Sequence, residues 1–245
     1  MKPYLSPFRT YRKFVLHKDE VQFQVVVEET DLFIIAETNL KQEIINYTNY
    51  LRSQIKSYIE IHPNFLTSLK PLPFDPKAPP IVQEMLLASS LFEVGPMAAV
   101  AGSIAEAIAK KFSSMSKNLI IENGGDIYIY STQPRIIGLL SNPKENITLG
   151  LKLTPKQFPC AVCTSSGKIG HSLSFGKGDL AVVVSQSGAK ADAAATFFSN
   201  LLISKKDLTP VLKQAQKLKS KGIDGIFLQF NELIGAWGEI EIVSV

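Results

Sequence analysis

The sequence predicts an α+β fold in which mostly antiparallel sheets pack against helices. Short runs with the alternating pattern of strands are interspersed with longer runs whose apolar residues recur every third or fourth position. The strand-like runs follow one another closely, and short connections favour antiparallel pairing over parallel crossovers. With 245 residues, 45% of them hydrophobic and 20% charged, the chain can bury a substantial core. We therefore expect a single domain over residues 1–245.

Residues 1–68 predict a β-meander followed by a long helix. The strand-like runs at 14–16, 21–27 and 32–36, separated by turn residues, predict a hairpin or a three-stranded meander. From Leu40 the apolar spacing becomes helical, with Asn39 as a candidate N-cap and His62-Pro63 as the end of the helix. The five prolines at 69–80 predict a connector that packs against the body of the protein.

Residues 81–245 form the predicted ligand-site core. Two helical segments open this region, at 80–92 and 95–112, and the alanine-rich second segment has a narrow apolar stripe suited to packing on a sheet. Further strands are predicted at 118–121, 126–130, 136–140, 148–153, 160–164, 180–185, 226–230 and 238–245, and further helices at 189–202 and 208–219. This distribution places the largest sheet in the second half of the chain.

Composition excludes several classes of protein. Apolar runs such as 97–109 are too short to cross a bilayer, and the N-terminus lacks the apolar stretch of a signal peptide, so we expect a cytoplasmic protein without membrane contact. The lysine-rich run at 205–221 lacks interleaved aromatic residues, which favours a solvated helix face over a nucleic-acid surface. Cys160 and Cys163 lack a second pair for zinc, and we expect packed side chains, with Cys163 as a candidate to line the site.

Small, hydroxylated and acidic residues gather where a ligand site is expected. Of the 15 glycines, 11 lie between Gly95 and Gly188, where they permit close approach of a ligand to the backbone. The candidate ligand-binding residues are Gly95, Met97, Asn123, Gly124, Gly125, Asp126, Thr164, Ser165, Ser166 and His171, and the candidate metal ligands are Asp192 and Thr196. Such groups suit a phosphorylated ligand held with a divalent cation.

Each motif also has a purely structural interpretation. Asp192 and Thr196 lie one helical turn apart and can ligate a hard cation, or they can be a helix-start acid and a packed hydroxyl. The Gly124-Gly125 pair can present N–H groups to a ligand or form a plain hairpin turn. The hydroxyls at 164–166 can hold phosphate or ribose, or make a turn. His171, flanked by polar residues, is a candidate for phosphate contact or proton transfer.

The order of these motifs resembles the ApbE-like flavin transferases, and most closely an uncharacterised cytoplasmic branch of that superfamily. The resemblance covers roughly 95–200 and rests on Gly-Gly-Asp after a strand, Thr-Ser followed by a histidine, and Ala-Asp-Ala-Ala-Ala-Thr. It implies a T-fold-like α+β fold, a cleft for FAD or FMN, and Mg²⁺-dependent transfer of FMN onto a serine or threonine of a partner protein. It also implies catalytic roles for Asp192 and His171 and a metal-binding role for Asp192 and Thr196.

Two departures from that pattern leave alternatives open. The segment after His171 reads Ser-Leu-Ser-Phe without the expected Asp-Pro, and the stretch 95–102 lacks the lysine of a Lys-Gly pair. Since a phosphate-facing lysine contributes charge that a neutral residue cannot replace, a non-catalytic ligand-binding or sensor protein is the alternative to an enzyme. A third class, a homo-oligomeric scaffold, rests on the apolar C-terminal run at 240–245.

Overall fold

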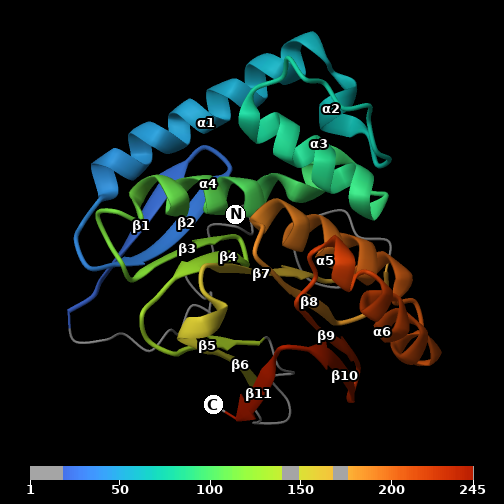
Figure 1. Cartoon of the computed structure of the whole chain (residues 1–245). Coiled ribbons are helices and arrows are strands. Elements are labelled where there is room, and N and C mark those ends of the chain that lie inside the picture. The colour runs from blue at the N-terminus through green and yellow to red at the C-terminus, as the bar shows by residue number, and fades with distance from the viewer. Residues whose placement is uncertain (1–18, 140–148, 168–175, 245) are drawn as a thin grey trace, which may run out of the picture.

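The computed structural model describes residues 19–139, 149–167 and 176–244. In these residues a large sheet of eight strands is covered by helices on one face and by a three-stranded sheet on the other (Figure 1). The large sheet has the order β1-β2-β3-β4-β7-β8-β9-β10, and each neighbouring pair is antiparallel. The small sheet, β11-β6-β5, is also antiparallel. The predicted α+β class with antiparallel sheets is therefore confirmed.

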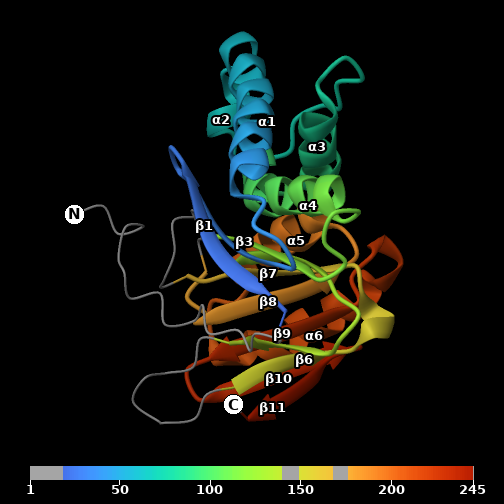
Figure 2. The same cartoon turned by 90° about the vertical axis from the view of Figure 1, so that its left-hand side faces the viewer.

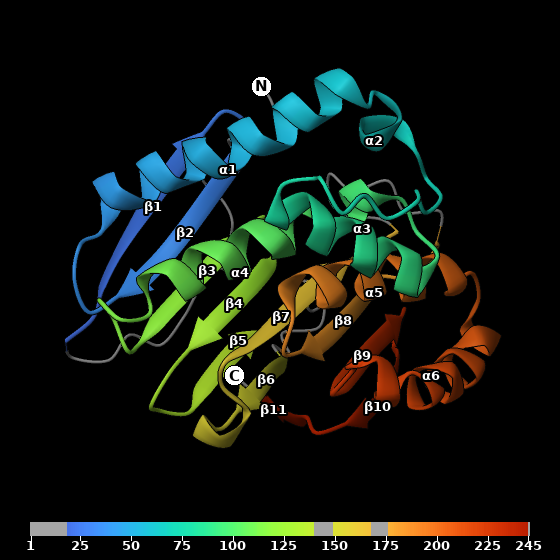
Figure 3. The ribbon, with the colours of Figure 1, turned by 45° about the horizontal axis from the view of Figure 1, so that its top comes forward.

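The strands are β1 (Val21–Val27), β2 (Thr30–Ala36), β3 (Leu119–Asn123), β4 (Asp126–Tyr130), β5 (Arg135–Gly138), β6 (Leu149–Leu153), β7 (Cys160–Ser165), β8 (Leu180–Ser185), β9 (Gly225–Phe230), β10 (Leu233–Gly238) and β11 (Glu241–Ser244). The α-helices are α1 (Lys41–Ile61), α2 (Asn64–Thr67), α3 (Pro80–Phe92), α4 (Val100–Phe112), α5 (Gly188–Leu201) and α6 (Leu208–Lys217). The 3₁₀ turn η2 (Pro96–Ala99) leads into α4. Figure 3 shows the strands of the large sheet in sequence across the molecule.

The helices form because their apolar residues fall on one face. In α1, the buried residues Ile44, Thr48, Leu51 and Ile55 recur every three or four positions. The end of α1 is at His62, as predicted, while its N-cap residue is Leu40. The neighbouring Asn39 nevertheless accepts a hydrogen bond from the Lys41 N–H at 3.1 Å. Figure 2 shows α1, α3, α4 and α5 on the same side of the large sheet.

The predicted N-terminal hairpin is formed by β1 and β2, and β2 also pairs with β3, so that the hairpin extends the large sheet. Ile34 of β2 is buried under the helices and Ile35 is buried against the small sheet, as expected for an inner strand. The prediction near the C-terminal end was wrong in extent: the strand within 238–245 is only β11 (Glu241–Ser244), and β10, which ends at Gly238 with φ 99°, was not predicted. The predicted strand at 14–16 lies outside the described residues.

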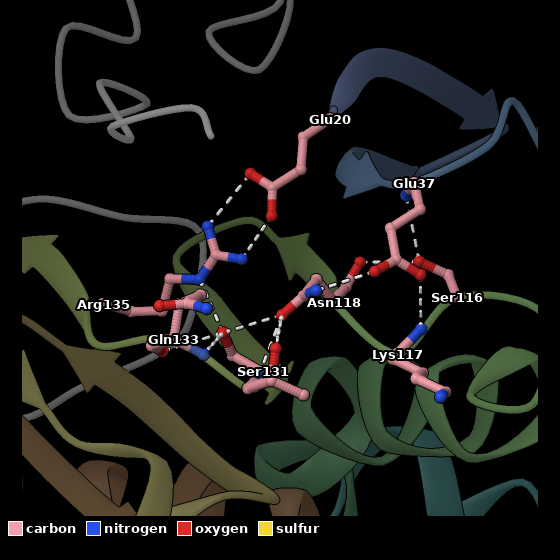
Figure 4. Close-up of polar contacts among 9 residues, drawn as sticks. Glu20, Glu37, Ser116, Lys117, Asn118, Ser131, Gln133 and Arg135 are labelled. Carbon is pink, nitrogen blue, oxygen red and sulfur yellow. Dashed lines mark hydrogen bonds and ion pairs between the residues drawn. The ribbon is translucent and has the colours of Figure 1, made fainter. Parts of the chain in front are cut away.

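A buried polar network ties the two sheets together at one end of the β3–β4 hairpin (Figure 4). Arg135 of β5 makes a bidentate ion pair with Glu20, and both side chains are about 3% exposed. The Arg135 Nε also donates to Ser131 at 2.8 Å, and Ser131 in turn donates to Asn118. Asn118 donates to Glu37 at 2.7 Å. The network therefore fixes the small sheet relative to the start of β1 and the end of β2.

No single helix of the described residues is long and apolar enough to cross a membrane. The segments Pro80–Phe92 and Pro96–Phe112 meet that test only when taken together, and they are bent by 106° relative to each other.

Candidate functional site

The β3–β4 hairpin carries polar side chains to the helix-covered face of the sheet. Gly124 and Gly125 form its two-residue turn, with φ values of 67° and 111° that glycine adopts without strain. Asn123 and Asp126 face each other across the first pair of the ladder. Because Tyr128 belongs to the helix-side core, alternation places Asp126 on that same side. The Asn123 amide donates to the Ala101 carbonyl at the start of α4, at 3.2 Å.

Helices α4 and α5 meet above this turn in an arrangement that we call the glycine–acid clasp, formed by Gly102, Glu106, Gly188 and Asp192. The Gly102 N–H donates to Asp192 Oδ2 at 2.9 Å, and the Gly188 N–H donates to Glu106 Oε2 at 2.7 Å. A Cβ on Gly102 would lie 2.2 Å from the Gly188 oxygen, and a Cβ on Gly188 would lie 2.3 Å from the Gly102 oxygen. Both glycines are therefore required by the close contact of the two backbones.

Asp126 is a buried carboxylate held by two donors. Its Oδ1 accepts from the Thr164 N–H at 3.0 Å, and the Cys163 thiol donates to the same side chain. Burial, with a smaller contribution from the negative charge of Glu122, raises the pKa of Asp126 to about 7, although the two hydrogen bonds oppose the rise. The charged form of Asp126 is thus costly in the protein at neutral pH.

Asp192 lies in the same cluster and is subject to the same forces. Burial raises the pKa of Asp192 well above its usual range, and the charge of Asp126 adds to the rise. Hydrogen bonds from the Gly102 and Ala101 N–H groups act in the opposite direction. The charge of Asp126 therefore acts on Asp192, and the two buried carboxyl groups belong to one electrostatic cluster.

The two halves of the clasp differ in how their acids are compensated. Glu106 and Lys110 are four residues apart on α4, and their side chains form an ion pair at 2.6 Å. On α5 the corresponding position, four residues after Asp192, is the buried Thr196. Within the described residues, neither Asp192 nor Asp126 forms an ion pair with a lysine or arginine. Glu106 is therefore paired with a lysine of its own helix. At the equivalent position of α5, Asp192 has only the neutral hydroxyl of Thr196.

Comparison with known proteins identifies the family. A family model described as "AbpE bacteria" matches residues 13–236. The chain belongs to this family. It is also similar to a UPF0280 protein of Methanococcus aeolicus, at 38% identity over 84% of this chain and 88% of the relative. A UPF0280 protein of Methanocaldococcus jannaschii is 37% identical over 89% of this chain and 90% of the relative.

Solved structures share the fold of this AbpE-family chain. The flavin transferase ApbE from Vibrio cholerae has a TM-score of 0.60 at 11% identity and covers 89% of this chain and 96% of its own. The flavinyl transferase ApbE of Pseudomonas stutzeri, in its apo form, has a TM-score of 0.57 at 10% identity, covering 92% and 94%. At such low identity the likeness shows the fold, as the resemblance in the sequence implied.

The predicted hydroxyls at 164–166 lie at the end of β7, with Thr164 and Ser165 inside the strand and Ser166 directly after it. The Thr164 hydroxyl already has a partner in the protein, because its Oγ1 donates to the Gly125 carbonyl at 3.2 Å. Ser165 continues the strand face of Ala161 and Cys163, which belong to the helix-side core. Its buried Oγ has no hydrogen-bond partner in the part of the chain that the structure describes. Ser166 is half-buried at the end of the strand, and His171 lies outside the described residues.

The glycines predicted to bind a ligand have roles in the fold itself. Gly124 is exposed at the turn, and the Gly125 N–H is already bonded to Glu122 Oε1 at 2.7 Å. Gly95 is buried, and a Cβ there would lie 1.8 Å from the Ser68 oxygen, so the position packs against the connector. Met97 is half-buried in η2. The residues of this region that contact Asp192 are instead Ala101 and Gly102.

Sequence reasoning missed Gly102 and Glu106 as parts of the site. A signal was present, because Gly-Ser-Ile-Ala-Glu at 102–106 and Gly-Ala-Lys-Ala-Asp at 188–192 have the same glycine-to-acid spacing. Only the crossing of α4 and α5 shows that each glycine serves the acid of the other helix.

A metal-binding role for Asp192 and Thr196 is consistent with the donors present. The described residues contain no group of three or more His, Cys, Asp or Glu side chains arranged to hold a metal ion. Two carboxylates supplemented by a hydroxyl are nevertheless the kind of donors that Mg²⁺ accepts, since it keeps several waters and takes one or two carboxylates from a protein. The donors fit a hard cation and do not fit a zinc site built from thiolates and imidazoles.

Proposed function

We propose that this protein binds a flavin nucleotide, FAD or FMN, together with a divalent cation such as Mg²⁺, and that it transfers FMN from FAD to a partner protein. The observation that carries the proposal is the buried pair Asp126 and Asp192, which has no compensating lysine or arginine among the described residues. Burying two ionised carboxylates together is strongly unfavourable, so the pair either takes up a proton or binds a cation.

Asp192 and Thr196 would hold the cation, and Asp126 would contribute its carboxylate from the opposite side of the cluster. When bound, the cation would neutralise the diphosphate and stabilise negative charge that develops on the leaving phosphate. The clasp excludes water from Asp192 and fixes its Oδ2 on the Gly102 N–H. The buried hydroxyl of Ser165 is a donor available to a ligand oxygen on the same face.

The flavin part of the proposal is supported by the names of the solved structures that share the fold, which are flavin transferases. In the proposed transfer, a serine or threonine hydroxyl of the acceptor forms a bond to the phosphorus of the FMN half. The phosphoanhydride bond breaks, AMP leaves, and the hydroxyl proton passes to a base. His171 remains the predicted candidate for that proton transfer.

The second candidate is a protein that binds the same ligand without catalysis. It is favoured by Ala101, which precedes Gly102 where the resemblance implies a lysine. The Ala101 carbonyl accepts from Asn123, and its N–H group bonds to Asp192, so this position contributes hydrogen bonds but no positive charge. Weaker attraction for the diphosphate is the expected consequence.

Flavin binding and turnover can be separated in one set of measurements. Purified protein is titrated with FAD in the presence of Mg²⁺ or of EDTA, with flavin fluorescence reporting binding and chromatography reporting release of AMP. We expect FAD binding that requires Mg²⁺ and is lost in Asp192→Asn. AMP release supports the transferase, and Mg²⁺-dependent binding without AMP supports the second candidate. If FAD neither binds nor raises the melting temperature with Mg²⁺ present, both are wrong.

A further inference from the structure

Glu106 has no place in the proposed chemistry, although it is buried and negatively charged. Its side chain is about 8% exposed, and it extends from the middle of α4 towards the first turn of α5. There Oε2 accepts from the Gly188 N–H at 2.7 Å and from the Ser187 hydroxyl at 3.3 Å. Lys110 contacts the other oxygen, Oε1. Each oxygen of this carboxylate therefore has a defined partner.

The contacts of Glu106 hold the start of α5 together with the Ser187 N-cap, whose side chain accepts from the Lys190 N–H. The first N–H groups of a helix have no partner within the helix, so an acceptor from outside fixes the helix end in space. Gly188 lies four residues before Asp192, one helical turn away on the same face. A displacement of Gly188 along or around the helix axis would therefore move Asp192 by a similar amount.

The crossing of the helices makes this link stiff. The Gly102 and Gly188 backbones approach so closely that neither residue can carry a Cβ, and each N–H bonds to the acid of the opposite helix. Asp192 thus receives its orientation from α4 through Gly102, and α4 holds α5 in place through Glu106. The two hydrogen bonds close a ring through both helices.

We infer that Glu106 is a positioning residue for Asp192, acting through the Gly188 N–H and the glycine–acid clasp. The inference rests on the proposed function, since the role of Asp192 as a cation ligand is part of that proposal. Glu106 acts through the length of its side chain, which brings an acceptor oxygen to the Gly188 N–H of α5. Its negative charge is compensated by Lys110. Residues that orient metal ligands typically change metal affinity about 10–100-fold when they are removed.

The test compares Mn²⁺ affinity, measured from free Mn²⁺ by electron paramagnetic resonance, in the full chain and four variants. Glu106→Ala removes the acceptor, Glu106→Asp keeps the charge but shortens the reach, and Glu106→Gln keeps the reach but removes the charge. Lys110→Met is the matched control, because it removes the ion pair and leaves the Gly188 contact in place. We expect about 10-fold or weaker binding for the alanine and aspartate variants. The glutamine and methionine variants should stay within about 3-fold of the parent protein.

A second readout decides the inference without a metal. Amide hydrogen exchange at Gly102 should accelerate in Glu106→Ala and Glu106→Asp, although Glu106 does not bond to that amide, and should be unchanged in Glu106→Gln. Equal Mn²⁺ affinity in all variants would overturn the inference, and so would a glutamine variant as impaired as alanine, which would indicate an effect of charge. If the parent protein binds no Mn²⁺, the proposed function fails, and exchange at Gly102 still decides whether Glu106 positions Asp192.

Discussion

Replacing Asp126 by asparagine should stabilise the protein at alkaline pH when no divalent cation is present. Asparagine keeps an oxygen to accept from the Thr164 N–H and removes the buried charge. A pKa of about 7 in the folded protein, against an ordinary value of 3.8, corresponds to about 4 kcal/mol in favour of the neutral acid. That figure is an upper bound for the gain, because the substituted side chain loses the hydrogen bond that the Cys163 thiol donates to Asp126.

The sign of the pH dependence follows from the raised pKa of Asp126. The stability that the protonated Asp126 side chain contributes is fully present below about pH 4, and it is lost as the pH rises through about 7. The gain of Asp126→Asn over the parent protein should therefore be absent at pH 4 and reach its full value near pH 8. For a chain of this length, about 4 kcal/mol corresponds to a rise of roughly 8–16 °C in melting temperature.

Thermal and urea unfolding in EDTA at pH 4, 6 and 8 measure this difference. Asp19→Asn, which removes an exposed carboxyl, is the matched control and should change stability little at any of these pH values. A variant that is no more stable than the parent protein at pH 8 would refute the reasoning, because it would mean that the buried carboxylate carries no penalty. A gain that is the same at pH 4 and pH 8 would refute it as well, since the effect would not depend on ionisation.

Three further predictions concern the site and the framework. Asp192→Asn should abolish the rise in melting temperature caused by Mg²⁺, and retention of that rise would contradict the cation site. Gly188→Ala should cost about 3 kcal/mol in urea unfolding, because its Cβ would meet a backbone oxygen at 2.3 Å. Glu20→Ala should cost about 3–5 kcal/mol by leaving the buried Arg135 guanidinium unpaired. By contrast, Glu241→Ala, which breaks an exposed pair, should cost less than about 1 kcal/mol, and similar costs for the two would argue against burial as the cause.

Local patterns in the sequence predicted the helices and strands well, but they predicted poorly which distant strands pair with each other. The period of α1 and the Gly124-Gly125 turn can be derived from neighbouring residues, because they depend on side-chain spacing and positive φ. The continuous apolar run at 32–36 indicates that both faces of β2 are buried, but it does not reveal that β3 is the partner strand. At the candidate site, Asp126 and Asp192 could be singled out from the sequence one by one, whereas the hydrogen bond between Gly188 and Glu106 depends on the contact of two helices.

The pairing of β2 with β3 has a consequence for how the chain folds. Ile34 and Ile121 are partners in the sheet, yet α1 to α4 separate them in the sequence. The hairpins β1–β2 and β3–β4 can form from local contacts, whereas joining them requires closure of a long loop and is expected to be slow. The clasp needs α4 and α5, which lie on either side of β3 to β8 in the sequence. A ligand of Asp192 should therefore bind only chains that have completed this late assembly, and its binding would report completion of folding.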